Sequence, residues 1–183
     1  MLKRAVTLLF AFVLCAAAAA SAQERKNLQV FRDISEQVNR YTQFTIFDTV
    51  DASVVEGQVV LDGWVTMPFK KDELERRVRT VTGVTAVDNR IQVLPVSQFD
   101  DELRFRIARA IYGNSAFWAY AAMANPPIHI VVNRGKVTLL GVVQSNVERQ
   151  LARSLATGFA SFGVANELKT DEEVQAELEK IGQ

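Results

Sequence analysis

Two segments of alternating apolar and polar residues repeat almost the same nine-residue phrase. Residues 57–65 read GQVVLDGWV and residues 135–143 read GKVTLLGVV, with both glycines, one Val, the Leu and the final Val in register. Such self-similarity indicates a repeated structural unit. Each phrase follows a short apolar stretch through Gly57 or Gly135, and glycine readily supplies the positive φ of a tight hairpin turn. We therefore expect each phrase to form the second strand of a β-hairpin.

The residues around the first phrase predict a helix, the hairpin, a second helix and a third strand. Apolar residues recur at helical spacing over residues 27–41, as Phe31, Ile34, Val38 and Tyr41. Residues 50–55 and 58–66 alternate as strands. Pro68 suits the first turn of the next helix, and residues 84–94 form the expected last strand.

The same order begins again after a short joint at residues 95–97. Acidic residues 100–102 open a helix that is expected to stop at Gly113-Asn114, and strands follow at residues 128–133 and 136–144. Ser145 and Glu148 have the spacing of a capping box at the start of the next helix. A similar pattern, Thr170 to Glu173, begins a short amphipathic helix with Val174, Leu178 and Ile181 on its apolar face.

The sequence therefore predicts an α+β fold of two repeated α-β-β-α-β modules, each a small three-stranded mixed sheet with two helices on one face. The expected modules cover residues 27–95 and 98–170, and a C-terminal short helix covers residues 171–183. The expected structural glycines are Gly57, Gly63, Gly135 and Gly141. Gly63 and Gly141 lie inside strands, where glycine is unfavourable. We interpret them as places where a helix packs closely, in preference to places that a ligand approaches.

The first 22 residues have the pattern of a secretion signal. A basic pair precedes an apolar run over residues 5–20, and Ala20-Ser21-Ala22 has the small-x-small form that predicts cleavage after Ala22. A membrane anchor is disfavoured because the run is short for a bilayer span. Lipidation at Cys15 is disfavoured by the large Leu14 before it. We expect a periplasmic protein with no transmembrane segment in the mature chain.

Cleavage changes what the composition implies. Removing 22 of the 183 residues leaves a mature chain of 161, enough for one ordinary core or two small ones. The only cysteine is removed with the signal, so the mature chain forms no disulfide. Loss of Lys3 and Arg4 turns an even balance of 21 basic and 21 acidic residues into a formal charge of −2. This charge argues against nucleic acid as a partner.

The hairpin phrase, a following helix and a Val-x-Asn motif occur together in both copies and resemble the BON domain. The motif is Val87-x-Asn89-x-Ile91 in the first copy and Val164-x-Asn166-x-Leu168 in the second. The resemblance covers residues 30–94 and 98–170, although Ala160-Ser161 replaces Gly83-Val84 before the third strand. It implies a non-enzymatic periplasmic protein that attaches to a phospholipid membrane or another cell-envelope surface, with a role in osmotic or envelope stress.

The connection before the second hairpin is five residues longer than its counterpart and rich in aromatics. It carries Phe117, Trp118, Tyr120 and Met123 ahead of Pro126-Pro127. Trp and Tyr suit a membrane interface, which is wet on one side and apolar on the other. The alternative is that these side chains cover the small second core or the joint between the modules. The pattern leaves open whether this segment is helix or loop.

Two further surfaces are candidates for contact with a membrane or a protein. Strand parity turns Val60, Trp64, Leu140 and Val142 away from the helix-covered faces. Apolar sheet backs of this kind pair domains, dimerise chains or meet lipid, and Trp64 is the largest residue among them. Arg104, Arg106 and Arg109, on the first helix of the second module, are candidates to meet lipid phosphates or are simply solvated.

The sequence carries no pattern of catalytic, metal-binding or cofactor-binding residues. His129 is the only histidine, and we expect it on the outer surface of its strand without the Cys or second His of a metal site. Residues 171–173 fit a charged first helical turn better than a cation site. Glycine-rich phosphate loops and nucleophile elbows are missing. We expect no enzymatic activity, no metal and no cofactor.

The leading functional hypothesis is attachment to phospholipid or another envelope surface. The second hypothesis is a periplasmic protein-interaction adaptor or chaperone-like module that uses the sheet backs and the aromatic segment. A hydrolase of envelope polymers is the third. The sequence leaves the oligomeric state and the relative orientation of the modules open.

Overall fold

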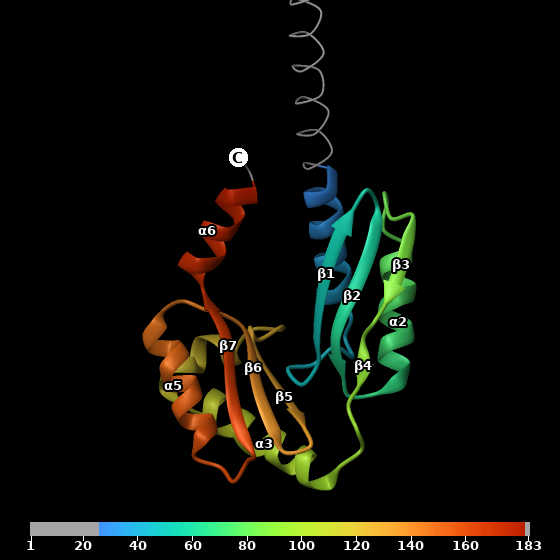
Figure 1. Ribbon diagram of the computed structural model, residues 1–183. Coiled ribbons are helices and arrows are strands. Elements are labelled where there is room, and N and C mark those ends of the chain that lie inside the picture. Colours follow the sequence, from blue (N-terminus) through green and yellow to red (C-terminus); the bar gives the residue numbers. More distant parts are fainter. Residues whose placement is uncertain (1–25, 182–183) are drawn as a thin grey trace, which may run out of the picture.

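The structure is a computed structural model that describes residues 26–181, with side chains described up to residue 177. The secretion signal predicted over residues 1–22, and its cleavage after Ala22, lie outside the described residues. Figure 1 shows two modules of similar design, one on each side of the molecule, joined by the linker that enters α3 (Gln98–Tyr112).

The first module has the predicted order of helix, hairpin, helix and strand. Its elements are a helix over residues 26–39, β1 (Thr49–Val55), β2 (Gln58–Val65), α2 (Pro68–Arg79), β3 (Ala86–Asn89) and β4 (Gln92–Val93). Strand β2 is central, antiparallel to β1 and parallel to β3 and β4. Both helices cover one face of this sheet, where Ile34, Leu61 and Leu74 are buried together.

The second module repeats this order with additions. Its elements are α3, η1 (Ser115–Phe117), α4 (Trp118–Ala121), β5 (Ile128–Asn133), β6 (Lys136–Val143), α5 (Asn146–Thr157), β7 (Gly163–Thr170) and α6 (Asp171–Ile181). Strand β6 is central, antiparallel to β5 and parallel to β7. Helices α3 and α5 close over the buried Ile107, Ile130 and Leu139. The predicted α+β fold of two α-β-β-α-β modules is confirmed.

Each hairpin turns through two residues of positive φ. The values are 51° and 80° at Glu56 and Gly57, and 52° and 76° at Arg134 and Gly135. Positive φ at both central residues defines the tight turn that best matches strand twist. Glycine adopts positive φ without strain, whereas other residues are strained there. The buried carboxylate of Asp100 accepts the N–H groups of Arg134 and Gly135, each at 2.8 Å. Asp100 therefore fixes the second turn to the start of α3.

The glycines inside the strands have a different cause from the one expected. Gly63 and Gly141 have φ of 136° and 111°, and an added Cβ would lie 2.2 Å from the carbonyl oxygen of Thr49 or 1.9 Å from that of Pro127. The predicted close packing of a helix is wrong, since the neighbouring backbone carbonyl occupies the space. Both glycines are nevertheless architectural, because only glycine accepts this backbone conformation without strain.

The asparagine of the third-strand motif links strand to helix in both modules. Asn89 donates to the backbone oxygen of Lys71 at 3.1 Å, and Asn166 donates to that of Arg149 at 2.9 Å. In the first module the oxygen of the Asn89 side chain also accepts the N–H of Ile91 at 3.2 Å. This local bond accompanies an interruption at residues 90–91, so the strand expected to be continuous over residues 84–94 is divided into β3 and β4.

The two capping-box patterns have different outcomes. Thr170 and Glu173 form both reciprocal bonds, at 2.9 and 3.3 Å, so the acidic residues 171–173 belong to a helix start, as predicted. The backbone N–H of Thr170 holds the pKa of Glu173 below its usual value. Ser145 accepts the N–H of Glu148, but the Glu148 carboxylate turns to the N–H of Gln144 at 3.0 Å instead of returning to Ser145.

Candidate functional site

The modules are joined by the segment between the N-terminal helix and β1. The carbonyl oxygen of Ile46 accepts the N–H of Ile130 on the edge of β5 at 2.7 Å. The ring of Phe47 packs edge to face on Phe105 of α3, with centroids 5.1 Å apart. Backbone pairing and aromatic packing together tie the first module to the second sheet.

His129 lies inside this joint. Its Nδ1 is 2.6 Å from the carbonyl oxygen of Asp48, and its ring packs against Phe44 with centroids 5.6 Å apart. A carbonyl only accepts, so Nδ1 carries the proton. Burial lowers the pKa of His129, and the nearby Asp48 and Asp51 partly oppose this shift. The histidine is on the predicted outer face of its strand, but contact with the first module leaves it half-buried instead of freely exposed.

Asp48 lies at the open end of the first hairpin, just before β1. Its buried carboxylate accepts the N–H of Thr66 at 2.8 Å and pairs with the ammonium group of Lys70 at 2.6 Å. In the second module, the hydroxyl of Tyr120 accepts the N–H of Gln144 at 3.0 Å and donates to Glu148 at 2.7 Å. Burial and the bond to Glu148 raise the pKa of Tyr120 to about 12. The added segment thus supplies the group that Asp48 supplies in the first module.

The aromatic segment divides into buried and accessible residues. It forms the short helical turns η1 and α4, in which Phe117 is fully buried and Tyr120 nearly so. Trp118 and Met123 keep 64% and 48% of their surface exposed. Asn125, further along, donates to the carbonyl oxygen of Asn39 at 2.9 Å. Phe117 and Tyr120 therefore leave the candidate contact surface, because they serve the second core.

The arginines of α3 divide in the same way. Arg104 is buried, donates to the carbonyl oxygen of Val132 at 2.6 Å and pairs with Asp101. It cannot reach a lipid phosphate in this conformation. Arg106 and Arg109 are exposed, and the guanidinium carbon of Arg106 lies 5.3 Å from the ring centroid of Phe159.

The outward face of α3 brings apolar and basic side chains together. Phe99 and Phe105 are 51% and 62% exposed, although α3 buries Leu103, Ile107 and Ile111 on its other side. At 3.6 residues per turn, Phe99, Phe105, Arg106 and Arg109 fall on one half of the helix. Their neighbour Glu102 is 3.6 Å from Arg106. Exposed aromatics beside arginines are unusual for a face that only meets water.

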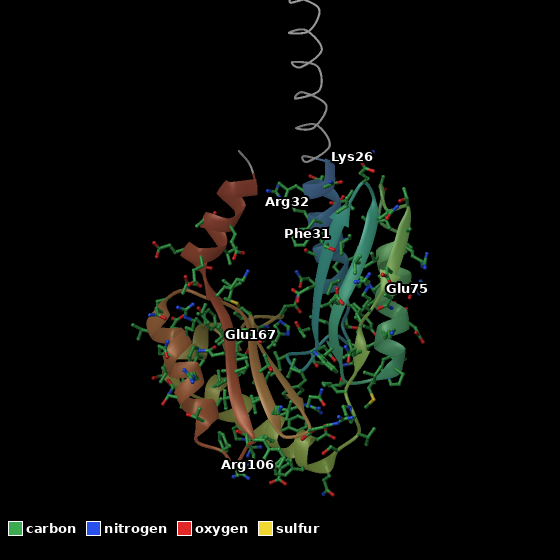
Figure 2. The ribbon with its side chains drawn as sticks, viewed as in Figure 1. Lys26, Phe31, Arg32, Glu75, Arg106 and Glu167 are labelled. Atoms are coloured by element: carbon green, nitrogen blue, oxygen red, sulfur yellow. The ribbon has the colours of Figure 1, made fainter. Side chains whose placement is uncertain are left out.

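Two loops extend this face. The hairpin turn at Arg134 and Gly135 is bound to Asp100 of α3, and the N–H of Phe162 donates to the carbonyl oxygen of Gly135 at 2.8 Å. Phe162 is 79% exposed, and Arg134 and Lys136 are exposed beside it. Figure 2 labels Arg106 at this end of the molecule, opposite to Lys26. We name the following set the basic–aromatic surface: Phe99, Phe105, Arg106, Arg109, Arg134, Lys136 and Phe162.

Only Arg106 and Arg109 of this surface were predicted from the sequence. Phe99 and Phe105 could have been predicted as exposed, because helical spacing places both outside the buried face of α3. Phe162, Arg134 and Lys136 were not, since the fold alone brings the two loops to the helix.

The predicted sheet backs face each other in part. Val60, Trp64, Leu140 and Val142 are half-buried. Leu140 and Val142 line a cleft of about 730 Å³ between the modules, whose other walls are the N-terminal helix and β1. Figure 1 shows the two sheets diverging from the joint toward the N-terminal helix and α6. The structure does not place Trp64 in this cleft.

No helix within residues 26–181 is long and apolar enough to cross a membrane. Across the same residues, no group of three or more His, Cys, Asp or Glu side chains is arranged to hold a metal ion.

The arrangement defines a pair of small α+β modules with accessible surfaces. The chain belongs to the BON domain family, whose model matches residues 32–95 and 100–178. This membership supports a role at a membrane or elsewhere in the cell envelope, and the family is of a non-catalytic, binding type. No curated protein matches the chain.

Two solved structures share low sequence identity with the chain. One is from structural studies of CdsD, a structural protein of the type III secretion system of Chlamydia trachomatis, with 16% identity over 82% of this chain and 97% of that one, at a TM-score of 0.30. The other is the C-terminal domain of CdsD, with 14% identity over 74% and 96% of the two chains, at a TM-score of 0.27. At these TM-scores the likeness carries no functional argument.

Proposed function

We propose that the protein binds anionic phospholipid at a cell-envelope membrane through the basic–aromatic surface. The observation that carries this proposal is the shared outward face of α3, where exposed Phe99 and Phe105 lie beside Arg106 and Arg109. The ring of Phe99 and the part of the Phe105 ring that is not packed on Phe47 enter the headgroup region, while the guanidinium groups pair with phosphates. The family's association with membranes and the envelope supports the same role.

The energetics require both kinds of side chain. A basic residue close to an anionic membrane contributes about 1 kcal/mol, and full burial of a Phe side chain contributes roughly 1.5–3 kcal/mol. The mature chain carries a formal charge of −2, so long-range attraction is weak and the local excess of basic residues must orient the protein. Binding is therefore expected to weaken as salt screens the phosphates.

Co-sedimentation with vesicles tests this function. Mature protein is mixed with phosphatidylcholine vesicles that contain or lack phosphatidylglycerol, and the double variant Arg106→Gln/Arg109→Gln is compared with Arg76→Gln/Arg79→Gln. The control pair has the same spacing on α2 and is also exposed. The α3 variant should lose at least about fivefold in binding to anionic vesicles, since each charge near the surface contributes about 1 kcal/mol. Equal binding by the two variants, or by the two kinds of vesicle, would contradict the proposal.

Trp118 and Met123 belong to the same proposal as a second accessible contact. Trp118→Ala in the sedimentation assay measures the contribution of Trp118. The loss of vesicle binding should be smaller than that of the arginine pair, because Trp118 carries no charge. Trp64 is half-buried and not fully exposed, so we assign it no lipid contact.

Export to the periplasm, with cleavage after Ala22, is part of the proposal and rests on the sequence pattern of residues 1–22. Fractionation of expressing cells and N-terminal sequencing should give a periplasmic chain that begins at Gln23. A role in osmotic or envelope stress is proposed from family resemblance, and a deletion strain should then lose membrane integrity under osmotic shock.

A further inference from the structure

The cleft between the modules has an unpaired strand edge as one of its walls. Strand β1 pairs with β2 on one side, and its other edge has no strand partner among residues 26–181. Residues Thr49 to Ala52 of β1 line the cleft. An unpaired edge presents a row of backbone N–H and C=O groups that can accept another strand.

The remaining walls suit side chains of alternating type. Phe31 and Val38 of the N-terminal helix lie on one side, and Leu140 and Val142 of β6 lie on the other. Figure 2 labels Phe31 and Glu167, which come from opposite sides of the opening. Alternate residues of an extended chain would point toward these two walls, because side chains along a strand alternate in direction.

The joint shows that backbone pairing between the modules is compatible with this geometry. The carbonyl oxygen of Ile46, just before β1, already accepts the N–H of Ile130 on the edge of β5 at 2.7 Å. Beyond this bond the sheets diverge and the β1 edge is left without a partner strand. The cleft is therefore continuous with an edge contact that the fold itself uses.

The charges of the cleft favour a basic occupant. Asp51 and Glu167 are exposed acids on its opposite walls. The basic side chains among its lining residues are His129, which is bonded to the carbonyl oxygen of Asp48, and Lys169, which is paired with Glu177 at 2.7 Å. An occupant with Lys or Arg side chains would complement the two remaining carboxylates.

We propose that this cleft binds an extended peptide segment of a partner protein, with apolar and basic residues in alternation, by strand addition to β1. The volume of about 730 Å³ lies in the ordinary range of ligand clefts, about 300–1,000 Å³. A lipid acyl chain would leave the backbone groups of β1 without hydrogen bonds, whereas an added strand satisfies them. This peptide site is separate from the basic–aromatic surface and does not rest on the lipid proposal.

Fluorescence anisotropy with a defined probe tests the site. The probe is a fluorescein-labelled hexapeptide of alternating valine and lysine with amidated C-terminus, and its control is the same peptide with alternate backbone nitrogens methylated. The full mature chain should bind the first, and methylation should abolish binding, because a methylated nitrogen donates no hydrogen bond. Asp51→Asn/Glu167→Gln should weaken binding about 3–10-fold. Asp72→Asn, an exposed acid on α2 outside the cleft, should leave it unchanged.

Hydrogen exchange locates the bound peptide. Amide protons of residues 49–55 should exchange more slowly in the complex, while those of β7 should not change. Several outcomes overturn the proposal: no binding, equal binding of the methylated peptide, or binding without protection of β1. Binding of a fluorescent fatty acid in the cleft, without binding of the peptide, would assign the cleft to an acyl chain. Slower exchange of the β1 amide protons when the chain dimerises at high concentration would assign it to a second copy. Arg106→Gln/Arg109→Gln should bind the peptide normally, so failure of one site does not imply failure of the other.

Discussion

The hydroxyl of Tyr120 accepts the backbone N–H of Gln144 at 3.0 Å, just after the strand β6 ends. In the first module the carboxylate of Asp48 accepts the N–H of Thr66 at the same place after β2. The second module has Pro126 at the position that corresponds to Asp48, so it has no acid there. The aromatic addition therefore completes the repeated fold, and only its outer residues are accessible to a partner.

Tyr120→Phe should destabilise the protein by about 1–3 kcal/mol, because the N–H of Gln144 and the carboxylate of Glu148 each lose the Tyr120 hydroxyl and keep only their bond to each other. The ring stays in the core, so no cavity forms. Urea unfolding at neutral pH measures the change. Trp118→Phe is the matched control and should stay within about 0.5 kcal/mol, as an exposed side chain does. Equal stability of Tyr120→Phe and the parent would refute the anchoring role.

Gly141→Ala should destabilise the fold by at least about 1–3 kcal/mol, the usual cost of a strained backbone. Its φ of 111° disfavours any side chain, and the new Cβ would lie 1.9 Å from the carbonyl oxygen of Pro127. Gly158→Ala is the control, because the helix end at Gly158 has φ of −68° and its nearest neighbour is 3.4 Å away. Thermal unfolding should show a large decrease for the first variant and little change for the second. Similar melting temperatures would indicate that β5 relaxes freely.

The stability of the joint should depend on pH through His129. Burial lowers its pKa from 6.5 in the folded chain, so between the two pKa values the unfolded chain binds more protons. The stabilisation is complete above about pH 7 and decreases as pH falls through the unfolded value near 6.5. The free energy of unfolding at pH 7.5 minus that at pH 5.5 should be larger in the parent than in His129→Gln. If the two differences were equal, His129 would not titrate with folding.

The sequence was sufficient for the architecture because the fold depends on local patterns. Glycine at the turns, the alternation of Val59, Leu61 and Val65, and helical spacing each report directly on backbone geometry. It was insufficient for the break at residues 90–91, since the bond from the N–H of Ile91 to the Asn89 side chain has no periodic signature. The reason for Gly63 and Gly141 was also missed, because a one-dimensional pattern does not show which backbone oxygen lies beside a strand.

The candidate surfaces were predicted less completely, since exposure depends on how elements meet. The sequence does not distinguish the three arginines of α3, Arg104, Arg106 and Arg109. In the structure Arg104 is buried and bonded to the carbonyl oxygen of Val132, whereas the other two are exposed. Aromatic residues 117–120 likewise divide between core and surface, because Phe117 and Tyr120 join the second core beside α3 while Trp118 points outward. The cleft could not be predicted, because it arises from the relative placement of the two modules.

Site-specific fluorescence on vesicles tests the lipid-binding claim most directly. The mature chain has no cysteine, so Phe99→Cys and Val55→Cys each give one position for a polarity-sensitive nitrobenzoxadiazole label. Phe99 lies on the basic–aromatic surface, and the exposed Val55 lies beside the first hairpin turn, at the opposite end of the molecule in Figure 1. On vesicles with phosphatidylglycerol, the label at residue 99 should shift to shorter wavelength and the label at residue 55 should not. No shift at residue 99, or an equal shift at both positions, would contradict the account.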